Sequence, residues 1–262
     1  MSIEAASAYA DKHELHAILV DRSSDIVCER YANGYDAHKP HALYSGTKSF
    51  WGIAAIEAAR EALFQLDDTV VDTATVRMLL NMTAGYGFGG LGSAVPPYDK
   101  ALATPLKTIP GQTFTYSGIP LQVFGAFLAG RLGATGLTPH EYLRERVLEP
   151  AKVRIAAWRE LSDGTHPLPT GVQLTARDWR SYGRYVLEHR AKYADAFAGS
   201  AANARYGLCW WLGAAGAPRD LFYASGSAGQ GLYVVPSEDL VIVHFGKSAS
   251  YKHEAFLKRF FA

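Results

Sequence analysis

The chain has 262 residues, of which 48% are hydrophobic and 19% are charged, and its formal net charge is +1. This size and composition are typical of a globular protein with one large domain. The balanced charge argues against a nucleic-acid groove or a basic membrane-binding patch, and no apolar run is long enough to cross a membrane.

The N-terminus and the cysteines bear on where the protein works. MSIEAASAYADKHELHAILV carries acidic residues early and has no basic segment before an apolar one, so we expect no signal peptide. The only cysteines are Cys28 and Cys209, each in an apolar run that reads as a strand. We expect two reduced thiols rather than a disulfide or a metal site. Together these features favour a cytoplasmic protein.

Hydrophobic periodicity and turn residues divide the chain into strands and helices. The expected elements are a helix at 2–12, strands at 17–22 and 25–32, helices at 48–63, 75–82, 117–133, 138–151 and 175–190, strands at 206–212, 221–225, 231–236 and 240–246, and a helix at 250–262. We expect the segment 85–112, which is rich in glycine and proline, to be largely irregular.

This order of elements predicts an α+β fold. Strands at both chain ends flank a block of helices, which suggests one antiparallel sheet assembled from both ends, with helices flanking it. We expect a single domain over 1–262, with a sheet lobe from about 1–44 and 200–262 and a helical lobe from about 45–199. A cleft between the lobes would hold a small molecule.

The glycine-rich stretch GYGFGG at 85–90 matches the G-x-G-x-x-G pattern of dinucleotide-binding proteins. In those proteins the pattern follows a strand and opens a helix. Here it follows a predicted helix, so we do not expect a nucleotide cofactor.

LYSGTKSF at 43–50 contains a serine and a lysine three residues apart. In a helix beginning near Ser45, this residue and Lys48 would lie on one face, one turn apart. A lysine acts as a base only when it is neutral, and both burial and the positive end of a helix dipole disfavour its charged form. The chain has no other Ser-x-x-Lys. The pattern permits a serine nucleophile with its base, or an ordinary polar helix start.

Two further stretches could complete such a site. Tyr116, in PGQTFTYSGIP, could protonate a leaving group, or could be a packed ring in a turn. The second stretch is YASGSAGQGLYVV at 223–235. It could be a glycine-rich strand edge, which lets a ligand approach the backbone closely, or it could be a bulged hairpin. The backbone N–H of Ser45, at a helix start, is a candidate oxyanion donor.

Five stretches, in order, resemble the serine β-lactamase and penicillin-binding-protein superfamily, in its class C-like branch. That branch includes β-lactamase-like carboxylesterases, D-amino-acid peptidases and nylon-oligomer amide hydrolases. The stretches cover nearly the whole chain and are ERYANGYDAHKPHALYSGTKSF (29–50), TVRMLLNMTAG (75–85), IPGQTFTYSG (109–118), GVQLTARDWRSYG (171–183) and YASGSAGQGLYVVPSEDLVIV (223–243).

The resemblance implies a β-lactamase/transpeptidase-like fold and a role for each matching residue. It implies that Ser45 is the acylated nucleophile, that Lys48 is its base and is coupled to Tyr116, and that Tyr116 protonates the leaving group. It implies an oxyanion hole made by the N–H groups of Ser45 and Ser227. Further residues implied at the substrate site are Ser225, Gly226, Ser117 and Gly118.

Three features depart from the family pattern. Gly118 stands where the lactamases carry an asparagine. Ala224 stands where they carry a lysine, or relatives a histidine, so the usual anchor for a substrate carboxylate is missing. The segment between Val153 and Gly171 is short, which suggests a more open pocket. The missing anchor, and the missing charge at Ala224 that would stabilise a Tyr116 phenolate, argue against efficient cleavage of β-lactams or D-alanyl peptides.

We therefore expect a serine hydrolase that acts on small carboxylic esters through an acyl-enzyme, with no metal or organic cofactor. An amidase or D-amino-acid peptidase on the same site is the first alternative, and an added acid or base such as Asp99 or Glu160 would support it. A catalytically weak binding or sensor module is the second. The expected partner is a small-molecule ester or amide, and the oligomeric state stays open. Five aromatic residues could line an acyl pocket or pack in the core: Tyr44, Tyr86, Trp158, Trp210 and Tyr223.

Overall fold

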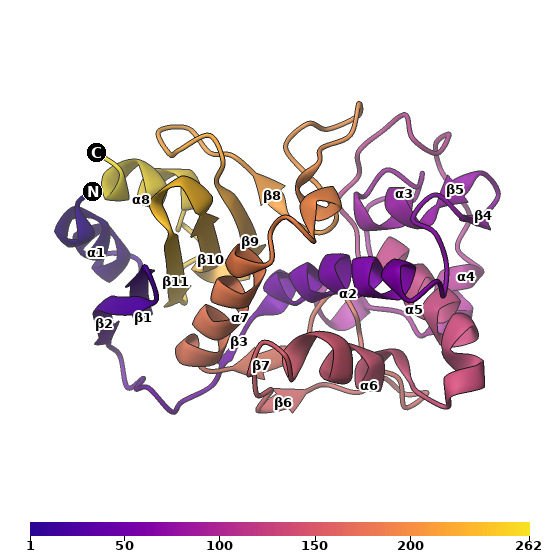
Figure 1. The fold of residues 1–262 in the computed structure, drawn as a ribbon, viewed down its shortest axis with the longest axis horizontal. Coiled ribbons are helices and arrows are strands. Elements are labelled where there is room, and N and C mark those ends of the chain that lie inside the picture. Colours follow the sequence, from indigo (N-terminus) through magenta and orange to yellow (C-terminus); the bar gives the residue numbers. More distant parts are fainter.

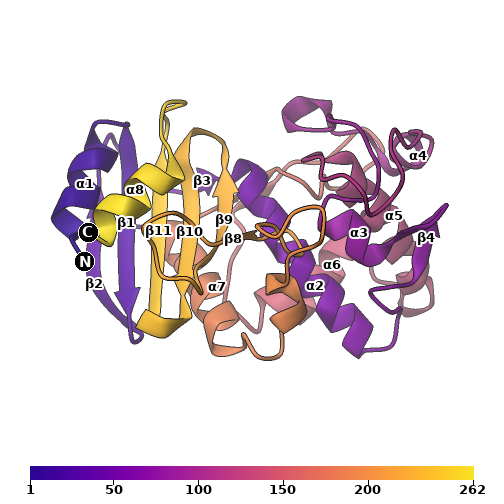
Figure 2. The ribbon, with the colours of Figure 1, turned by 90° about the horizontal axis from the view of Figure 1, so that it is seen from above.

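The protein is built around a six-stranded antiparallel sheet that draws strands from both ends of the chain (Figure 2). The computed structural model covers residues 1–262. The strand order is β2-β1-β11-β10-β9-β8. The bounds are β1 Leu15–Arg22, β2 Asp25–Tyr31, β8 Trp211–Leu212, β9 Phe222–Gly226, β10 Gln230–Val235 and β11 Leu240–Gly246. The predicted single sheet from both chain ends is confirmed.

Helices cover both faces of this sheet. Helices α1 (Ile3–Asp11) and α8 (His253–Phe260) lie side by side on one face, and α7 (Ala176–Glu188) packs on the other (Figures 1 and 2). Because side chains alternate along a strand, Leu232 of β10 joins the core on the α7 face, and its neighbour Tyr233 joins the core under α1 and α8.

The remaining helices form a second group beside the sheet, around the long helix α2 (Figure 1). Their bounds are α2 Ser49–Arg60, α3 Val76–Leu80, α4 Tyr98–Leu102, α5 Ile119–Leu132 and α6 Pro139–Leu143, which a π-helical turn at Arg144–Leu148 continues. Helix α2 is buried from Ser49 to Ala58, as expected for a helix that is apolar all round. None of the helices combines the length and apolarity that crossing a membrane requires. The division into one domain with two lobes stays a prediction.

Two small sheets lie outside the main one, and the sequence did not reveal them. One has the order β3-β7-β6, with β3 His41–Ala42, β6 Ala157–Trp158 and β7 Val172–Leu174; the other pairs β4 Thr69–Val71 with β5 Ala74–Thr75. Strands of two or three residues are too short to show a period of two. The pairing of β3 with β7 continues as Leu43 donates to the carbonyl of Val172 at 2.9 Å, which fixes the chain just before Ser45.

The strand predicted over 206–212 is wrong for most of its length, since only Trp211–Leu212 is a strand. Cys209 has a φ of 65°, and its N–H donates to the carbonyl of Leu80 at 3.0 Å, near the end of α3. A Cβ on Gly52 of α2 would overlap the carbonyl oxygen of Leu208. The segment is apolar because it packs between helices, not because it alternates across a sheet.

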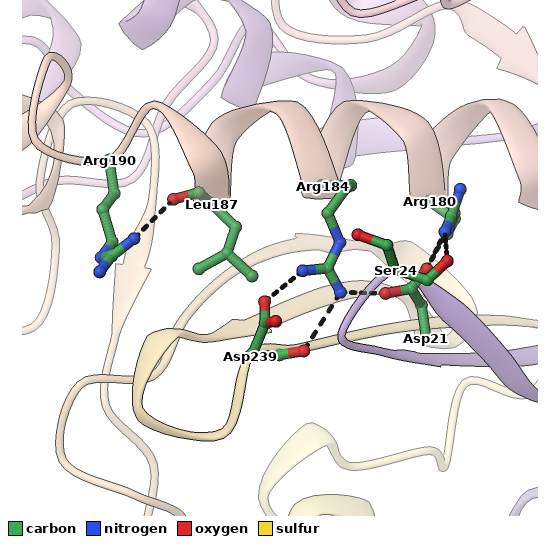
Figure 3. Close-up of polar contacts among 7 residues, drawn as sticks. All are labelled: Asp21, Ser24, Arg180, Arg184, Leu187, Arg190 and Asp239. Carbon is green, nitrogen blue, oxygen red and sulfur yellow. Dashed lines mark hydrogen bonds and ion pairs between the residues drawn. The ribbon is translucent and has the colours of Figure 1, made fainter.

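An ion-pair cluster fastens α7 to the sheet (Figure 3). The carboxylate of Asp21, on β1, is fully buried and accepts from Arg180 and Arg184 of α7. Arg180 also donates to the carbonyl of Ser24 at 2.8 Å, and Arg184 to the carbonyl of Asp239 at 3.1 Å. The cluster therefore ties the turns at the ends of two hairpins to one helix.

Candidate active site

Ser45 lies in a 3₁₀ helix at Tyr44–Lys48 that runs directly into α2. The sequence predicted a helix beginning near Ser45, and its first turn is 3₁₀ rather than α. Tyr44 has a φ of 47°, which is uncommon for a residue with a side chain and marks a strained, sharply turned backbone. The turn leaves Ser45 half-buried.

Lys48 points back at the nucleophile. Its Nζ lies 2.9 Å from the Oγ of Ser45, and the residue is only 1% exposed. Burial lowers the pKa of Lys48 to about 7, because a low-dielectric environment disfavours the ammonium. The nearby Cys209 supplies no counter-charge, since burial raises the pKa of its thiol to about 12. A large share of Lys48 is therefore neutral amine at pH 7.

Residues 167–170, Pro-Leu-Pro-Thr, form a strap over α2 that orients this lysine. The carbonyl of Pro169 accepts from Lys48 Nζ at 3.1 Å. The carbonyl of Leu168 accepts from Trp51 Nε1 at 2.9 Å, and its N–H donates to Gln122 of α5 at 2.8 Å. A carbonyl can only accept, so Pro169 binds a proton of the amine and leaves the lone pair free for Ser45. Sequence reasoning missed this contact because a backbone oxygen has no sequence signature.

Tyr116 lies against both residues. The Nζ of Lys48 is 4.9 Å from the centre of its ring. The ring stacks on Trp211 at 5.7 Å and meets Tyr206 edge-on at 5.9 Å. Burial raises the pKa of Tyr116 well above its usual value, which a hydrogen bond with Ser45 partly opposes. Tyr116 is therefore a neutral phenol near pH 7 and can donate a proton.

The end of β9 approaches the nucleophile from the other side. A Cβ on Gly226 would overlap the carbonyl oxygen of Leu43, so glycine lets the strand lie against the turn that carries Ser45. Strand β8 pairs only with Phe222 and Tyr223. The outer edge of the following residues therefore has no strand partner, and Ser227 stands at its end.

The geometry brings together Ser45 and Lys48 of one 3₁₀ helix, Tyr116 and the end of β9, from three separate parts of the chain. The model of the family called beta-lactamase matches residues 16–258, a range that contains all of them. The chain belongs to the beta-lactamase family. Members of this family are generally serine hydrolases. No relative was found among curated protein sequences.

Solved structures share the fold of this beta-lactamase-family chain at low sequence identity. A Bacillus anthracis protein assigned as a 6-aminohexanoate-dimer hydrolase is 22% identical, with a TM-score of 0.75 over 95% of this chain and 78% of its own. A penicillin-binding protein from Bacillus halodurans is 17% identical, with a TM-score of 0.75 over 96% of each chain. EstCE1, a hydrolase with promiscuous acyltransferase activity, is 14% identical, with a TM-score of 0.77 over 98% of this chain and 97% of its own.

Packing explains one departure from the beta-lactamase pattern. A Cβ on Gly118 would overlap the carbonyl oxygen of Gly90, so this backbone has no room for an asparagine. The carbonyl of Gly89 accepts from the N–H of Gly118 at 2.8 Å and from the hydroxyl of Ser117 at 2.9 Å. Ser117 is fully buried, and its hydroxyl makes its hydrogen bond within the protein. GYGFGG therefore supports the Tyr116 segment by close packing.

Ala224 and Ser225, neighbours on β9, face opposite sides of the sheet. Ala224 is 2% exposed and joins the core on the α7 face, so it brings no charge to the site. Ser225 is half-buried, and its hydroxyl lies 2.9 Å from Nε2 of His253 on α8. Sequence reasoning did not include His253, which is remote in the chain.

The five aromatic residues proposed to line an acyl pocket lie in different parts of the structure. Tyr44, next to Ser45, is 43% exposed, whereas Trp210 and Tyr86 are buried in the core. Trp158 donates to carbonyls of the 157–170 segment, and Tyr223 packs under α8. Trp211, the neighbour of Trp210, is the tryptophan that contacts Tyr116.

Two carboxylates named from the sequence make no polar contact with the nucleophile or its base. Asp99 is exposed and pairs with Lys100 at 3.8 Å, and Glu160 is exposed. Neither shares a hydrogen bond or an ion pair with Ser45, Lys48 or Tyr116. No three histidine, cysteine, aspartate or glutamate side chains converge as metal ligands, and both cysteines are free thiols.

Proposed function

We propose that the protein is a serine hydrolase that cleaves small carboxylic esters through an acyl-enzyme on Ser45. One observation carries the proposal: a fully buried lysine with a pKa of about 7 has its Nζ 2.9 Å from the Ser45 hydroxyl. A serine hydroxyl is a weak nucleophile until an adjacent base takes its proton. A base whose pKa is near the working pH is the most effective.

Acylation follows from this geometry. Ser45 Oγ attacks the ester carbonyl carbon, and its proton passes to Lys48 Nζ, where the Pro169 carbonyl stabilises the ammonium. The backbone N–H groups of Ser45 and Ser227 donate hydrogen bonds to the carbonyl oxygen and stabilise the negative charge that develops on it. When the bond to the alcohol breaks, Tyr116 gives its phenolic proton to the leaving oxygen. The Lys48 ammonium then returns a proton to the phenolate, which restores both groups.

Deacylation reverses these roles. A water molecule attacks the carbonyl carbon of the acyl-enzyme and gives its proton to neutral Lys48. The bond to Ser45 Oγ then breaks, the acid product leaves, and Ser45 regains a proton from Lys48. Each cycle consumes one water and regenerates the starting protonation states.

The residue at position 224 favours an ester over an anionic lactam or peptide. Ala224 contributes no cation for a substrate carboxylate, and nothing at that position stabilises a Tyr116 phenolate. An alcohol leaves more readily than an amine, so an ester demands less of the acid. An amide is the second candidate, since one structural neighbour is assigned as a 6-aminohexanoate-dimer hydrolase.

The test is a substrate panel of p-nitrophenyl esters, a chromogenic cephalosporin and D-alanyl anilides. Ester turnover that Ser45→Ala abolishes and the control Ser248→Ala, at a serine that is likewise half-buried, retains supports the proposal. Turnover that survives Ser45→Ala would contradict the nucleophile. Turnover of anilides alone would favour an amidase. A stable adduct on Ser45 in mass spectrometry, without turnover, would favour a sensor module.

A further inference from the structure

A chain of hydrogen bonds runs from Ser225 into the sheet face under α8. The Oγ of Ser225 is 2.9 Å from Nε2 of His253, and Nδ1 of His253 is 2.7 Å from the hydroxyl of Tyr233 on β10. The Tyr233 hydroxyl is in turn 3.0 Å from the hydroxyl of Tyr251. The mechanism above uses none of His253, Tyr233 and Tyr251.

The surroundings of this chain are built to hold it. Tyr233 is fully buried and Tyr251 is 6% exposed. A Cβ on Gly231 would overlap the Tyr233 hydroxyl, so glycine makes the room that this oxygen occupies. The start of α8 is anchored independently, because the N–H of Lys252 donates to the Tyr9 hydroxyl at 2.9 Å.

The direction of each proton follows from counting partners. The Tyr251 hydroxyl has one hydrogen-bond partner in the protein, the Tyr233 hydroxyl. A buried hydroxyl that does not donate leaves a polar group unsatisfied, so Tyr251 donates to Tyr233. Tyr233 then directs its own proton to its other partner, Nδ1 of His253.

The histidine passes this direction on to Ser225. Burial lowers the pKa of His253 to about 4, so the ring is neutral at pH 7 and carries one proton. Since Nδ1 accepts from Tyr233, that proton is on Nε2, which donates to Ser225 Oγ. His253 is the only hydrogen-bond partner of the Ser225 side chain. The proton of the Ser225 hydroxyl therefore has no acceptor within the protein.

We propose that the Tyr251–Tyr233–His253 chain holds Ser225 as a hydrogen-bond donor to the substrate. Ser225 is half-buried beside the unpaired edge of β9, where its free proton would bind an acceptor oxygen, a carbonyl or carboxylate, at the far end of the acyl chain of the bound ester. With no cation at Ala224, this neutral donor is the polar side chain that β9 offers there. His253 is a positioning residue that acts through Ser225. The substrate contact rests on the proposed function.

The position of the proton can be measured without turnover. In protein labelled with ¹⁵N-histidine, a long-range ¹H–¹⁵N spectrum at pH 7 distinguishes the two neutral tautomers, and His253→Gln identifies the signals. We expect His253 to carry its proton on Nε2, and Tyr233→Phe to shift the ring toward the other tautomer. A wild-type ring protonated on Nδ1, or on both nitrogens, would overturn the inference.

The substrate contact is tested with two esters of equal acyl length, p-nitrophenyl hemisuccinate and p-nitrophenyl butyrate. Only the first has an acceptor at the far end of its acyl chain. Ser225→Ala should raise the ratio of KM for the hemisuccinate to KM for the butyrate about fivefold, as expected for one lost hydrogen bond. His253→Ala should raise the same KM ratio by a similar factor. In a protein that already carries Ser225→Ala, His253→Ala should not change the ratio further.

Tyr9→Phe is the matched control, since it loosens the start of α8 without touching the hydrogen-bond chain. It should leave the ratio of the two KM values unchanged. Additive effects of Ser225→Ala and His253→Ala, or equal effects on both esters, would overturn the contact. If no turnover depends on Ser45, both the proposed function and the substrate contact are overturned. The ¹H–¹⁵N spectrum of His253 would still show, independently of turnover, in which direction the Ser225 hydroxyl proton points.

Discussion

The Nζ of Lys48 lies 3.1 Å from the carbonyl oxygen of Pro169, a residue 121 positions away in the chain. The lactamases carry an asparagine at the position of Gly118, and this chain has no room for one there. In this chain the acceptor that the strap offers to Lys48 is a backbone carbonyl. Because Trp51 and Gln122 hold the strap, the orientation of the amine depends on the packing of α2 and α5.

The first prediction is that ester hydrolysis depends on pH through Lys48. Its pKa is about 7, and only the neutral amine accepts the Ser45 proton. We therefore expect kcat/KM to be half-maximal near pH 7, to fall about tenfold per pH unit below it, and to level off above it. Tyr116, whose pKa is raised, stays protonated over this range. A profile that is flat from about pH 5.5 to 8.5 would contradict Lys48 as the base.

The second prediction is that Lys48→Met removes activity and stabilises the fold. The folded pKa of Lys48, about 7, is below its unfolded value, so the folded state binds fewer protons and wild-type stability rises from about pH 7 to 10. Methionine fills the site without a charge. At pH 6 we expect a gain in the free energy of unfolding on the order of 3 kcal/mol, from about 1.4 kcal/mol per pKa unit.

Melting temperatures of both proteins at pH 6 and pH 9 check this. The gain should shrink at the higher pH, where the wild-type lysine is neutral in the folded state and much of the penalty is relieved. A Lys48→Met protein that is less stable at both pH values would show that the two hydrogen bonds of Lys48 outweigh its desolvation.

The parts of the site that the sequence revealed are those in which side-chain identity carries the chemistry. Residue type and spacing made Ser45, Lys48 and Tyr116 candidates, the family resemblance gave each an expected role, and the structure brings them together. The acceptor on Pro169 was not predictable, because any residue supplies a carbonyl there. His253 was missed because only the folded sheet brings α8 against β9.

The elements of the fold also differ in how well the sequence predicted them. The long terminal strands and the apolar helices α2 and α5 have clear periodicity and were predicted close to their observed bounds. The two- and three-residue strands were not, since they rest on tertiary pairing alone. The run at 206–212 was taken for a strand because burial between helices and burial in a sheet both select apolar residues.

The third prediction is that Gly118→Ala destabilises the protein, whereas Gly130→Ala, at another glycine of the same helix region, does not. Gly118 has a φ of −92°, which alanine adopts freely, so any loss comes from overlap with the Gly90 carbonyl. We expect a loss of about 1–3 kcal/mol, as for other overpacked sites. A Cβ on Gly130 meets no atom within 4 Å, and alanine should stabilise this helix by up to about 1 kcal/mol. Urea unfolding measures both, and equal effects would contradict the packing argument.

The fourth prediction concerns the cluster in Figure 3 that fastens α7 to the sheet. Asp21 is fully buried between Arg180 and Arg184. Asp21→Asn removes the negative charge and leaves the largely buried Arg184 without its buried partner. Breaking a buried pair in this way typically costs about 3–5 kcal/mol.

Arg22→Gln is the matched control on the neighbouring residue. Its ion pair with Glu238 is exposed, with 48% and 35% of the two side chains accessible, and such pairs contribute at most about 1 kcal/mol. We expect Asp21→Asn to lower the melting temperature by roughly 6–15 °C and Arg22→Gln to change it little. Because α7 does not carry the nucleophile, ester hydrolysis well below the melting temperature should survive both changes. Similar melting temperatures for the two variants would show that the buried cluster contributes no more than a surface pair.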